Sequence, residues 1–247
     1  MPLDAKVVVI TGSAQGIGKH AAKTLAQQRA KVVIADFNEE NAKKTAAELE
    51  ELTETLSVYV DVRDEDSVRR MVDQVVDRFG RVDVLINNAA IVPHFAWRIP
   101  RWPRISDMPR EFWDRVIHTN LYGTFHGTKY VIPHMEKRKS GHIINLYGGG
   151  GLTPAGVCAY MASKDAIRTF TRYVAEEVRD SNICVVTFSP RVPIVTETAP
   201  EEAFNRLPGP QILGQAFVLA AQLPMEKTGQ CFAYEDGRLV NELPREG

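Results

Sequence analysis

The sequence predicts an α/β fold built on a doubly wound parallel sheet of about seven strands. Short apolar runs recur along the chain, longer amphipathic stretches separate them, and no linker, repeat or low-complexity segment interrupts the alternation. Runs that are apolar at successive positions are typical of parallel strands covered on both faces, and strand–helix repeats form right-handed crossovers within one sheet. A chain of 247 residues can bury one large core, so we expect a single domain over residues 1–247.

Each expected element follows from its local pattern. The expected strands are the apolar, often β-branched runs Lys6 to Ile10, Lys31 to Ala35, Thr55 to Val60, Val82 to Ile86, His142 to Leu146, Cys184 to Ser189 and Gln230 to Tyr234. The expected helices, where apolar residues recur at three- and four-residue spacing, are Gly18 to Gln28, Glu39 to Leu52, Ser67 to Phe79, Glu111 to Arg138 and Tyr160 to Asp180. Two proline-rich regions, near 92–108 and 192–210, follow the carboxyl ends of strands. Ligands bind at that edge of such sheets, so we expect substrate loops there.

Composition and charge exclude several function classes. The formal net charge is −1, so no overall field attracts nucleic acid or an anionic membrane. No apolar run reaches the roughly 18 residues that a membrane span needs. The first residues carry charges and lead into no long apolar segment, so we expect no signal peptide and a cytoplasmic protein. The three cysteines lack a CxxC spacing, so we expect buried free thiols and no metal site.

A glycine-rich turn follows the first expected strand. Thr11 to Gly18 reads Thr-Gly-Ser-Ala-Gln-Gly-Ile-Gly. Glycines there permit a tight turn and let backbone N–H groups approach a pyrophosphate, while the following helix adds partial positive charge. This strand–turn–helix context, with an acid at the end of the second strand, predicts a dinucleotide site.

The acid that follows the second strand, Asp36, indicates which dinucleotide binds. A carboxylate at this position can accept hydrogen bonds from the adenosine ribose hydroxyls, and it would repel a 2′-phosphate. Neither Phe37 nor the Ser13-Ala14-Gln15 segment supplies an Arg or Lys to compensate. We therefore expect NAD as the cofactor rather than NADP. The alternative is that Asp36 merely caps the helix that begins near Glu39.

Tyr160 and Lys164 are candidates for proton transfer. Residues four apart lie on one face of a helix, so the two side chains should project together. A tyrosine pKa is normally ~10, and an adjacent ammonium together with a positive nicotinamide ring would favour the phenolate. Tyr160 could then take a hydroxyl proton as hydride leaves for the nicotinamide, or return it in reduction. The alternative is a half-buried aromatic residue beside a solvated lysine.

Six motifs, in the same order, resemble those of the short-chain dehydrogenase/reductase family, and the resemblance covers nearly all of the chain. They are Thr11 to Gly18, Asp61-Val62, Asn87-Asn88-Ala89-Ala90, Asn120, Tyr160 with Lys164, and Thr228-Gly229. The resemblance implies a single-domain Rossmann fold, a nicotinamide cofactor, a small-molecule substrate, and a homodimer or homotetramer. It also implies that Asn120 helps to hold a proton-relay water. The implied cofactor-binding residues are Gly12, Ser13, Gln15, Gly16, Ile17, Gly18, Asp36, Phe37, Asp61, Val62, Asn88, Ala89, Tyr160, Lys164, Pro190 and Thr196.

The chain departs from the family pattern after the fifth strand. Family members place a serine there whose hydroxyl hydrogen-bonds the substrate oxygen. Counting back from Tyr160 leads to Tyr147, and counting forward from Gly141 leads to Gly148, so the register stays open. Loss of such a donor typically costs ~10²–10³ in rate. Tyr147 is the candidate substitute donor; the alternative is that Tyr147 only packs and Gly148 to Gly151 form an open floor for a bulky substrate.

Two further segments differ from the family. The family's Pro-Gly appears as Pro190-Arg191, which replaces glycine's backbone freedom with a charge close to the expected nicotinamide position. Thr196, the expected carboxamide contact, lies one residue further along than usual, and the segment from Pro190 to Thr228 is short. The loop from His94 to Arg104 interleaves aromatic residues with arginines. It could form a wall for a planar or anionic substrate or a subunit interface; single-stranded nucleic acid binding does not fit the neutral net charge.

Three functions are compatible with these residues. The first is an NAD-dependent dehydrogenase or ketoreductase that interconverts a secondary alcohol and a ketone, with aromatic or anionic substrates as candidates. The second is a non-redox enzyme in which tightly held NAD oxidises the substrate transiently to permit elimination or cleavage. The third is a catalytically disabled NAD-binding protein. We expect the first.

Overall fold

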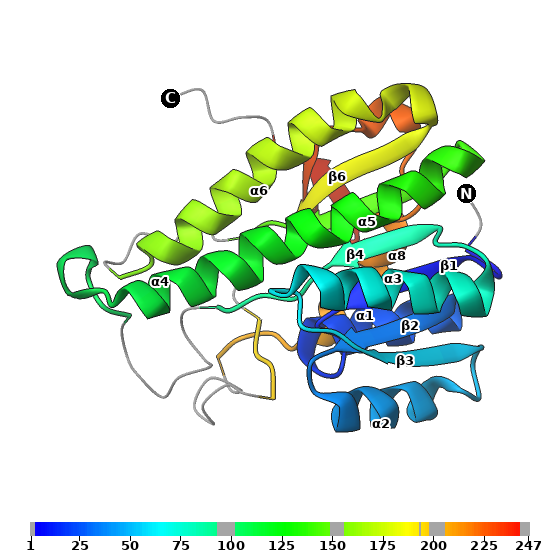
Figure 1. Ribbon diagram of the computed structural model, residues 1–247, viewed down its shortest axis with the longest axis horizontal. Helices are drawn as coiled ribbons and strands as arrows, with labels where there is room; N and C mark the ends of the chain where they lie inside the picture. Colours follow the sequence, from blue (N-terminus) through cyan, green and yellow to red (C-terminus); the bar gives the residue numbers. More distant parts are fainter. Residues whose placement is uncertain (1–2, 93–101, 149–155, 193, 198–205, 243–247) are drawn as a thin grey trace.

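One sheet organises the computed structural model, which describes residues 3–92, 102–148, 156–192, 194–197 and 206–242. Its strand order is β3-β2-β1-β4-β5-β6-β7-β8 (Figure 1). The strands are β1 (Val7–Thr11), β2 (Lys31–Asp36), β3 (Thr55–Tyr59), β4 (Val84–Asn87), β5 (Gly141–Leu146), β6 (Ile183–Ser189), β7 (Cys231–Glu235) and β8 (Arg238–Asn241). Strands β1 to β7 run parallel, and β8 pairs antiparallel with β7. The order reverses between β1 and β4, where the chain crosses back over the sheet.

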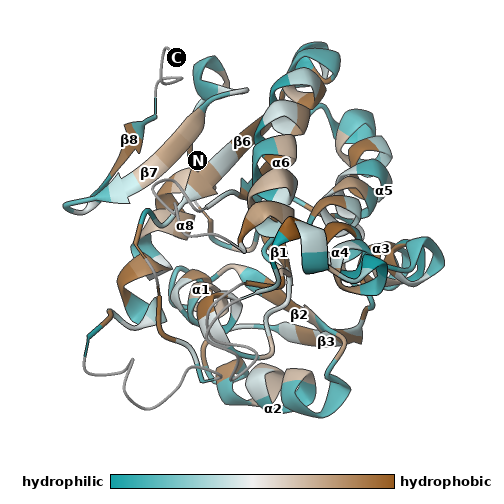
Figure 2. Cartoon of the chain, turned by 90° about the vertical axis from the view of Figure 1, so that its left-hand side faces the viewer, coloured by the Kyte–Doolittle hydropathy of each residue, from teal (hydrophilic) through white to brown (hydrophobic). Residues whose placement is uncertain are grey.

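Helices cover both faces of the sheet (Figure 1). One face carries α1 (Gly16–Gln27), α2 (Glu39–Leu49) and α8 (Gly214–Ala220); the other carries α3 (Glu65–Phe79), α5 (Gly123–Arg138) and α6 (Cys158–Glu177), with α4 (Arg110–Ile117) beside α6. Successive strand residues point to opposite faces, so Val8 and Ile10 enter the core under α1 while Val7 and Val9 enter the core under α3. In Figure 2 the helices carry both hydrophobic and hydrophilic colours, as amphipathic helices on a sheet should.

The predicted doubly wound sheet is confirmed, with additions. The short strand β8, formed after a turn at Gly237 with φ +78°, makes an eighth strand. Helix α8 spans seven residues and was not predicted, because so short an apolar run shows no helical period. The helix expected from Glu111 to Arg138 is present as consecutive helical segments from Arg110 to Arg138. A π-helical turn, His118–Tyr122, separates α4 from α5.

Burial and hydropathy agree with the expectations for thiols and helices. Cys184 and Cys231 are buried free thiols, and Cys158 is a half-buried one. Within the described parts of the chain, none of the helices combines the length and the apolar character that a bilayer crossing requires.

Candidate active site

The glycine-rich turn joins β1 to α1, and its glycines are required by close packing. Gly12 and Gly16 have φ of +66° and +59°, a region that other residues rarely adopt. A Cβ on Gly18 would lie 2.4 Å from the carbonyl oxygen of Gly12. A Cβ on Gly12 would lie 2.8 Å from Cα of Ala89 in the loop after β4. The turn therefore fits closely against the start of α1 and against the neighbouring loop.

Hydrogen bonds lock this turn to the ends of three strands. Asn88 Nδ2 donates to the carbonyl oxygens of Thr11 and Gly12, at 2.9 and 2.8 Å. Thr11 Oγ1 accepts from the backbone N–H groups of Asn88 and Ala89, at 3.1 and 3.2 Å. Ser13 Oγ bridges the strands, donating to Ile10 and accepting from the N–H of Ala35. Ser13 and Asn88 thus shape the cradle, and the coupling role of Thr11 was not predicted.

A carboxylate already occupies the amino end of α1. The N–H of Gly16 donates to Glu197 Oε2 at 2.9 Å. The preceding residue, Thr196, lies over the same glycine, since a Cβ on Gly16 would come 3.2 Å from Thr196 Cγ2. Glu197 stands in for an oxygen of a diphosphate, so the residues present fit an anionic dinucleotide linker. Glu197 was not predicted, because it belongs to no recognisable motif.

The predicted ribose-binding acid closes the other side of the cradle. Asp36 is buried at the end of β2, where Oδ2 accepts from the N–H of Ala14 at 2.9 Å and Oδ1 accepts from the N–H of Asn38 at 3.0 Å. The capping interpretation is wrong: the N-cap of α2 is Asn38, whose side chain accepts from the N–H of Asn41. Phe37 is 73% exposed beside this carboxylate. Among the other predicted contacts in this region, Gln15 is exposed and Ile17 half-buried.

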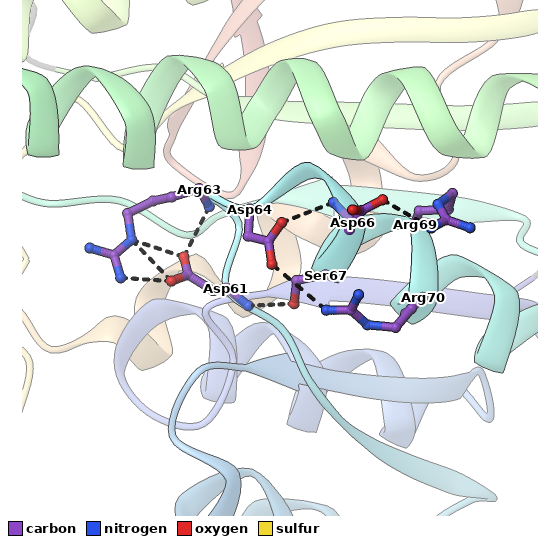
Figure 3. Close-up of polar contacts among 7 residues, drawn as sticks. All are labelled: Asp61, Arg63, Asp64, Asp66, Ser67, Arg69 and Arg70. Carbon is purple, nitrogen blue, oxygen red and sulfur yellow. Dashed lines mark hydrogen bonds and ion pairs between the residues drawn. The ribbon is translucent and has the colours of Figure 1, made fainter.

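The Asp61-Val62 pair lies beyond β3, and its carboxylate is engaged (Figure 3). Arg63 folds back onto Asp61, with Nε 2.9 Å from Oδ1 and one terminal nitrogen 2.6 Å from Oδ2. This pairing holds the pKa of the Asp61 carboxyl below its usual value. Ser67, on α3, accepts from the backbone N–H of Asp61 at 3.1 Å. Val62 is buried against Gly123 of α5, so Asp61 alone of this pair presents its side chain outward.

The structure brings Tyr160 and Lys164 together on α6, as predicted. Both side chains are buried, at 7% and 4% exposure, and Lys164 Nζ lies 5.7 Å from the centre of the Tyr160 ring. Lys164 Nζ donates to the carbonyl oxygen of Leu146 at 2.9 Å, which fixes it at the end of β5. A solvated lysine is therefore excluded.

Burial sets the pKa directions of this pair in the protein alone. It lowers the pKa of the Lys164 ammonium to about 8. Burial, with a smaller contribution from Tyr147, raises the pKa of the Tyr160 phenol. Desolvation disfavours both charged forms, so the lowered phenol pKa expected beside the ammonium and a positive nicotinamide ring stays a prediction for the cofactor-bound protein.

Asn120 lies in the π-helical turn and links two parts of the site. Its Oδ1 accepts from the N–H of Ile91 at 2.7 Å, and its Nδ2 donates to the Ile91 carbonyl at 3.2 Å and to Ser163 Oγ at 3.0 Å. Ser163 in turn donates to the carbonyl of Tyr160 at 2.7 Å. The amide thus ties the loop after β4 to α6, and its relay role stays a prediction. Ser163 lies within the Tyr–Lys motif, but its role in linking Asn120 to Tyr160 was not predicted.

Gly148 is the position that faces the phenol. A Cβ on Gly148 would lie 3.3 Å from Tyr160 Oη and 3.9 Å from Pro190 Cδ. This decides the open register: the family's serine position corresponds to Gly148, and Pro190 borders it. Tyr147 is buried and its ring lies 5.8 Å from the Arg168 guanidinium. Burial raises the pKa of the Tyr147 phenol, and the positive charge of Arg168 opposes that rise.

The expectation that Arg191 would lack the backbone conformation of glycine is wrong. Arg191 adopts φ +57°, the left-handed conformation that glycine would supply. Its guanidinium pairs with Glu242, at 2.7 Å, and with Glu235, both from the hairpin of β7 and β8. The charge near the nicotinamide position is therefore neutralised, and the turn after β6 is anchored.

The loop after β4 is partly placed. His94 to Arg101 lie outside the described residues, and so do Gly149 to Thr153 in the glycine segment. The expectations for Arg98, Arg101 and the glycine floor therefore stay predictions. Trp102 is 4% exposed and meets Tyr160 edge to face, with ring centres 6.5 Å apart. Arg104 is exposed.

A dinucleotide-type cradle and a buried Tyr–Lys pair at one sheet edge define a Rossmann-fold oxidoreductase. The short chain dehydrogenase family model matches residues 6–205, and the chain belongs to that family. The resemblance stated from the motifs is thereby confirmed.

Relatives of this chain are dehydrogenases and reductases. The 3-oxoacyl-[acyl-carrier-protein] reductase FabG of Thermotoga maritima is 34% identical over 97% of this chain and 100% of its own length. The cyclopentanol dehydrogenase of Comamonas testosteroni is 34% identical over 85% of this chain and 84% of its own. The crystal structure of a 3-ketoacyl-(acyl-carrier-protein) reductase from Brucella melitensis complexed with NADH is 28% identical, with a TM-score of 0.81 over 96% of this chain and 99% of that one.

Proposed function

We propose that this protein is an NAD-dependent oxidoreductase that interconverts a secondary alcohol and a ketone, on a small-molecule substrate in the cytoplasm. The observation that carries the proposal is the buried Tyr160–Lys164 pair, fixed to the end of β5 beside the glycine-rich cradle. The nicotinamide, when bound, supplies or accepts the hydride.

Tyr160 performs the proton transfer in this proposal. Because burial keeps its phenol protonated in the protein alone, it is set to donate a proton to the oxygen of a ketone. In the oxidative direction the phenol must first lose its proton, and a positive nicotinamide ring favours that loss. Oxidation should therefore speed up with rising pH more steeply than reduction does. Lys164, held by the Leu146 carbonyl, positions a cation below the phenol and is available to the nicotinamide ribose.

NAD is favoured over NADP by the groups around the adenosine end. Asp36 presents a buried carboxylate, and the charge of Arg63 is already paired with Asp61, so no described cation there awaits a 2′-phosphate. The remaining lone pairs of Asp36 can accept from ribose hydroxyls.

We further propose that the protein assembles as a homodimer or homotetramer. Exposed aromatic side chains on the outer sides of the helices support this: Tyr122 precedes α5, Phe125 lies on α5 and Tyr173 on α6. Aromatic side chains are enriched at subunit interfaces, so these three are candidate contacts with a second copy.

The decisive experiment is turnover by the wild type and by Tyr160→Phe on a panel of cyclic and aromatic secondary alcohols. We expect the wild type to form NADH in proportion to the alcohol consumed and Tyr160→Phe to form none. The two proteins should bind NAD with equal affinity. NADH formation by Tyr160→Phe would refute the assignment. A substrate that is consumed without net NADH would instead favour the transient-oxidation enzyme.

A further inference from the structure

Within the described part of the chain, the position that faces the Tyr160 hydroxyl carries no second side-chain donor. Gly148 faces the Tyr160 hydroxyl, and a Cβ there would lie 3.3 Å from it, so a hydroxyl-bearing side chain at this position would border the reacting oxygen. Glycine supplies none. The ring of Tyr147, the substitute donor predicted from the sequence, lies 5.8 Å from the Arg168 guanidinium, one helical turn beyond Lys164.

A buried donor without a partner lies against the same phenol. Trp102 is 96% buried, and among the described residues its indole Nε1–H has no hydrogen-bond partner. A buried unsatisfied donor costs about 1–3 kcal/mol, so such a group in a native protein requires an explanation, and a catalytic role is one. The Trp102 ring contacts Tyr160 edge to face, at 6.5 Å between centres and an interplanar angle of 90°.

The indole is also held in place. Its ring meets Phe112 of α4 edge to face, at 4.8 Å between centres. Its backbone carbonyl lies against Gly156, where an added Cβ would come within 2.4 Å and where φ is +96°. Trp102, Val116, Ala159 and Tyr160 form one hydrophobic cluster. A donor fixed in dry surroundings is the arrangement that stabilises charge developing on an oxygen.

We propose that the Trp102 indole N–H donates a hydrogen bond to the reacting oxygen of the substrate, in place of the hydroxyl that Gly148 lacks. The proposal rests on the alcohol–ketone function proposed above. It also specifies the substrate class: a neutral cyclic or aromatic ketone, or the matching secondary alcohol, whose apolar body packs against Trp102 and Phe112. In reduction, hydride reaches the carbonyl carbon, the oxygen gains negative charge and takes the Tyr160 proton, and the indole N–H stabilises that oxygen without giving up its own proton.

Kinetics with a rescue variant test this role. With 1-indanone and NADH, Trp102→Phe keeps an aromatic ring but removes the donor, so kcat should fall at least tenfold, toward the ~10²–10³ typical of a lost oxyanion donor. Adding Gly148→Ser to Trp102→Phe should raise kcat at least tenfold over that of Trp102→Phe alone. Trp113→Phe, which removes an indole from α4, is the matched control. If kcat fell less than twofold in Trp102→Phe, or if Gly148→Ser did not restore kcat in the double variant, the proposal would be overturned.

A binding measurement separates this inference from the proposed function. The protein has three tryptophans, whose indole ¹⁵N–H signals can be assigned with Trp→Phe variants. In the NAD-bound wild type, 1-indanone should move the Trp102 indole proton downfield, while indane, which lacks the oxygen, should not. Equal shifts, or no binding of 1-indanone, would refute the donor role. Absence of turnover with a downfield shift present would refute the proposed function and leave the donor role supported.

Discussion

The carboxyl edge of the sheet has two halves that are built in different ways. The nucleotide half, around the ends of β1 to β3, is shaped by backbone groups: the N–H of Gly16, the carbonyls of Thr11 and Gly12, and glycines with no room for a Cβ. The substrate half, around the ends of β5 and β6, is shaped by the side chains of Tyr160, Trp102 and Arg191 and by the lack of one at Gly148.

This difference explains where the chain follows its family and where it departs. A backbone cradle tolerates few alternatives, because one added methyl group collides with main-chain atoms. Side chains at the substrate half can be exchanged while the backbone path stays. Arg191 keeps the left-handed turn of the glycine that it replaces, with two carboxylates holding it there. Packing thus constrains the backbone of the nucleotide half, while the side chains of the substrate half have more freedom to vary.

The largest expected effect comes from a methyl group in the nucleotide half. Alanine normally stabilises a helix relative to glycine by about 1 kcal/mol. Gly18→Ala should instead lower the free energy of unfolding by about 1–3 kcal/mol, because its Cβ meets the Gly12 carbonyl. Displacement of the turn should also lower kcat/KM for NAD by about 10²-fold. Urea unfolding and cofactor kinetics measure the two effects.

The control for Gly18→Ala is Gly80→Ala. Gly80 caps α3 with φ +74°, and an added Cβ meets nothing within 4 Å. This variant should lose stability through backbone strain alone and keep its NAD kinetics. If both variants lost NAD affinity equally, close packing at the cradle would not be the cause.

The second prediction concerns the dryness of the substrate half. The pKa of Lys164 is about 8 when folded and near 10.5 when unfolded, so between these values the unfolded chain binds more protons and stability rises with pH. From pH 8 to 10 the wild type should gain about 2 kcal/mol relative to Lys164→Met. Above pH 10 the raised pKa of Tyr160 acts in the opposite sense.

Urea unfolding of both proteins at pH 7, 8, 9 and 10 checks this prediction. Taking the difference between the two proteins cancels the other titrating groups that they share. If the free energies of unfolding of the two proteins changed in parallel with pH, the Lys164 ammonium would be hydrated. The substrate half would then not be drier than the nucleotide half.

A smaller effect is expected at Asp36, on cofactor choice. Asp36→Asn removes a charge that would repel a 2′-phosphate, so the ratio of the NADP to the NAD dissociation constant should fall about tenfold, consistent with two charges a few ångströms apart near a surface. Glu40→Gln removes an exposed charge from the first turn of α2 and should leave the ratio unchanged. Calorimetric titration with both dinucleotides measures the ratio. If the ratio changed equally in the two variants, its change would result from the net charge of the protein and not from the position of Asp36.

The two halves also differ in what sequence could predict. Gly12, Gly16, Gly18 and Asp36 were predictable because a steric or charge requirement fixes the residue type at a fixed distance along the chain. Two contacts of Tyr160, with the Trp102 ring and with Gly148, depend instead on how segments far apart in the sequence pack together. Counting along the chain left Tyr147 and Gly148 open, and only the approach of Gly148 to the Tyr160 hydroxyl decided between them.

Glu197 joins the two halves, and its substitution gives the smallest expected effect. It follows the predicted nicotinamide contact Thr196 in the chain, yet its carboxylate lies on the Gly16 N–H where a diphosphate oxygen should bind. NAD must then displace a charge from a helix amino end, an interaction worth about 0.3–1 kcal/mol. Glu197→Gln keeps the shape and removes the charge, so NAD should bind about two- to fivefold more tightly. Glu177→Gln, an exposed carboxylate at the end of α6, is the control. Weaker NAD binding by Glu197→Gln would mean that this carboxylate supports the bound cofactor rather than competing with it.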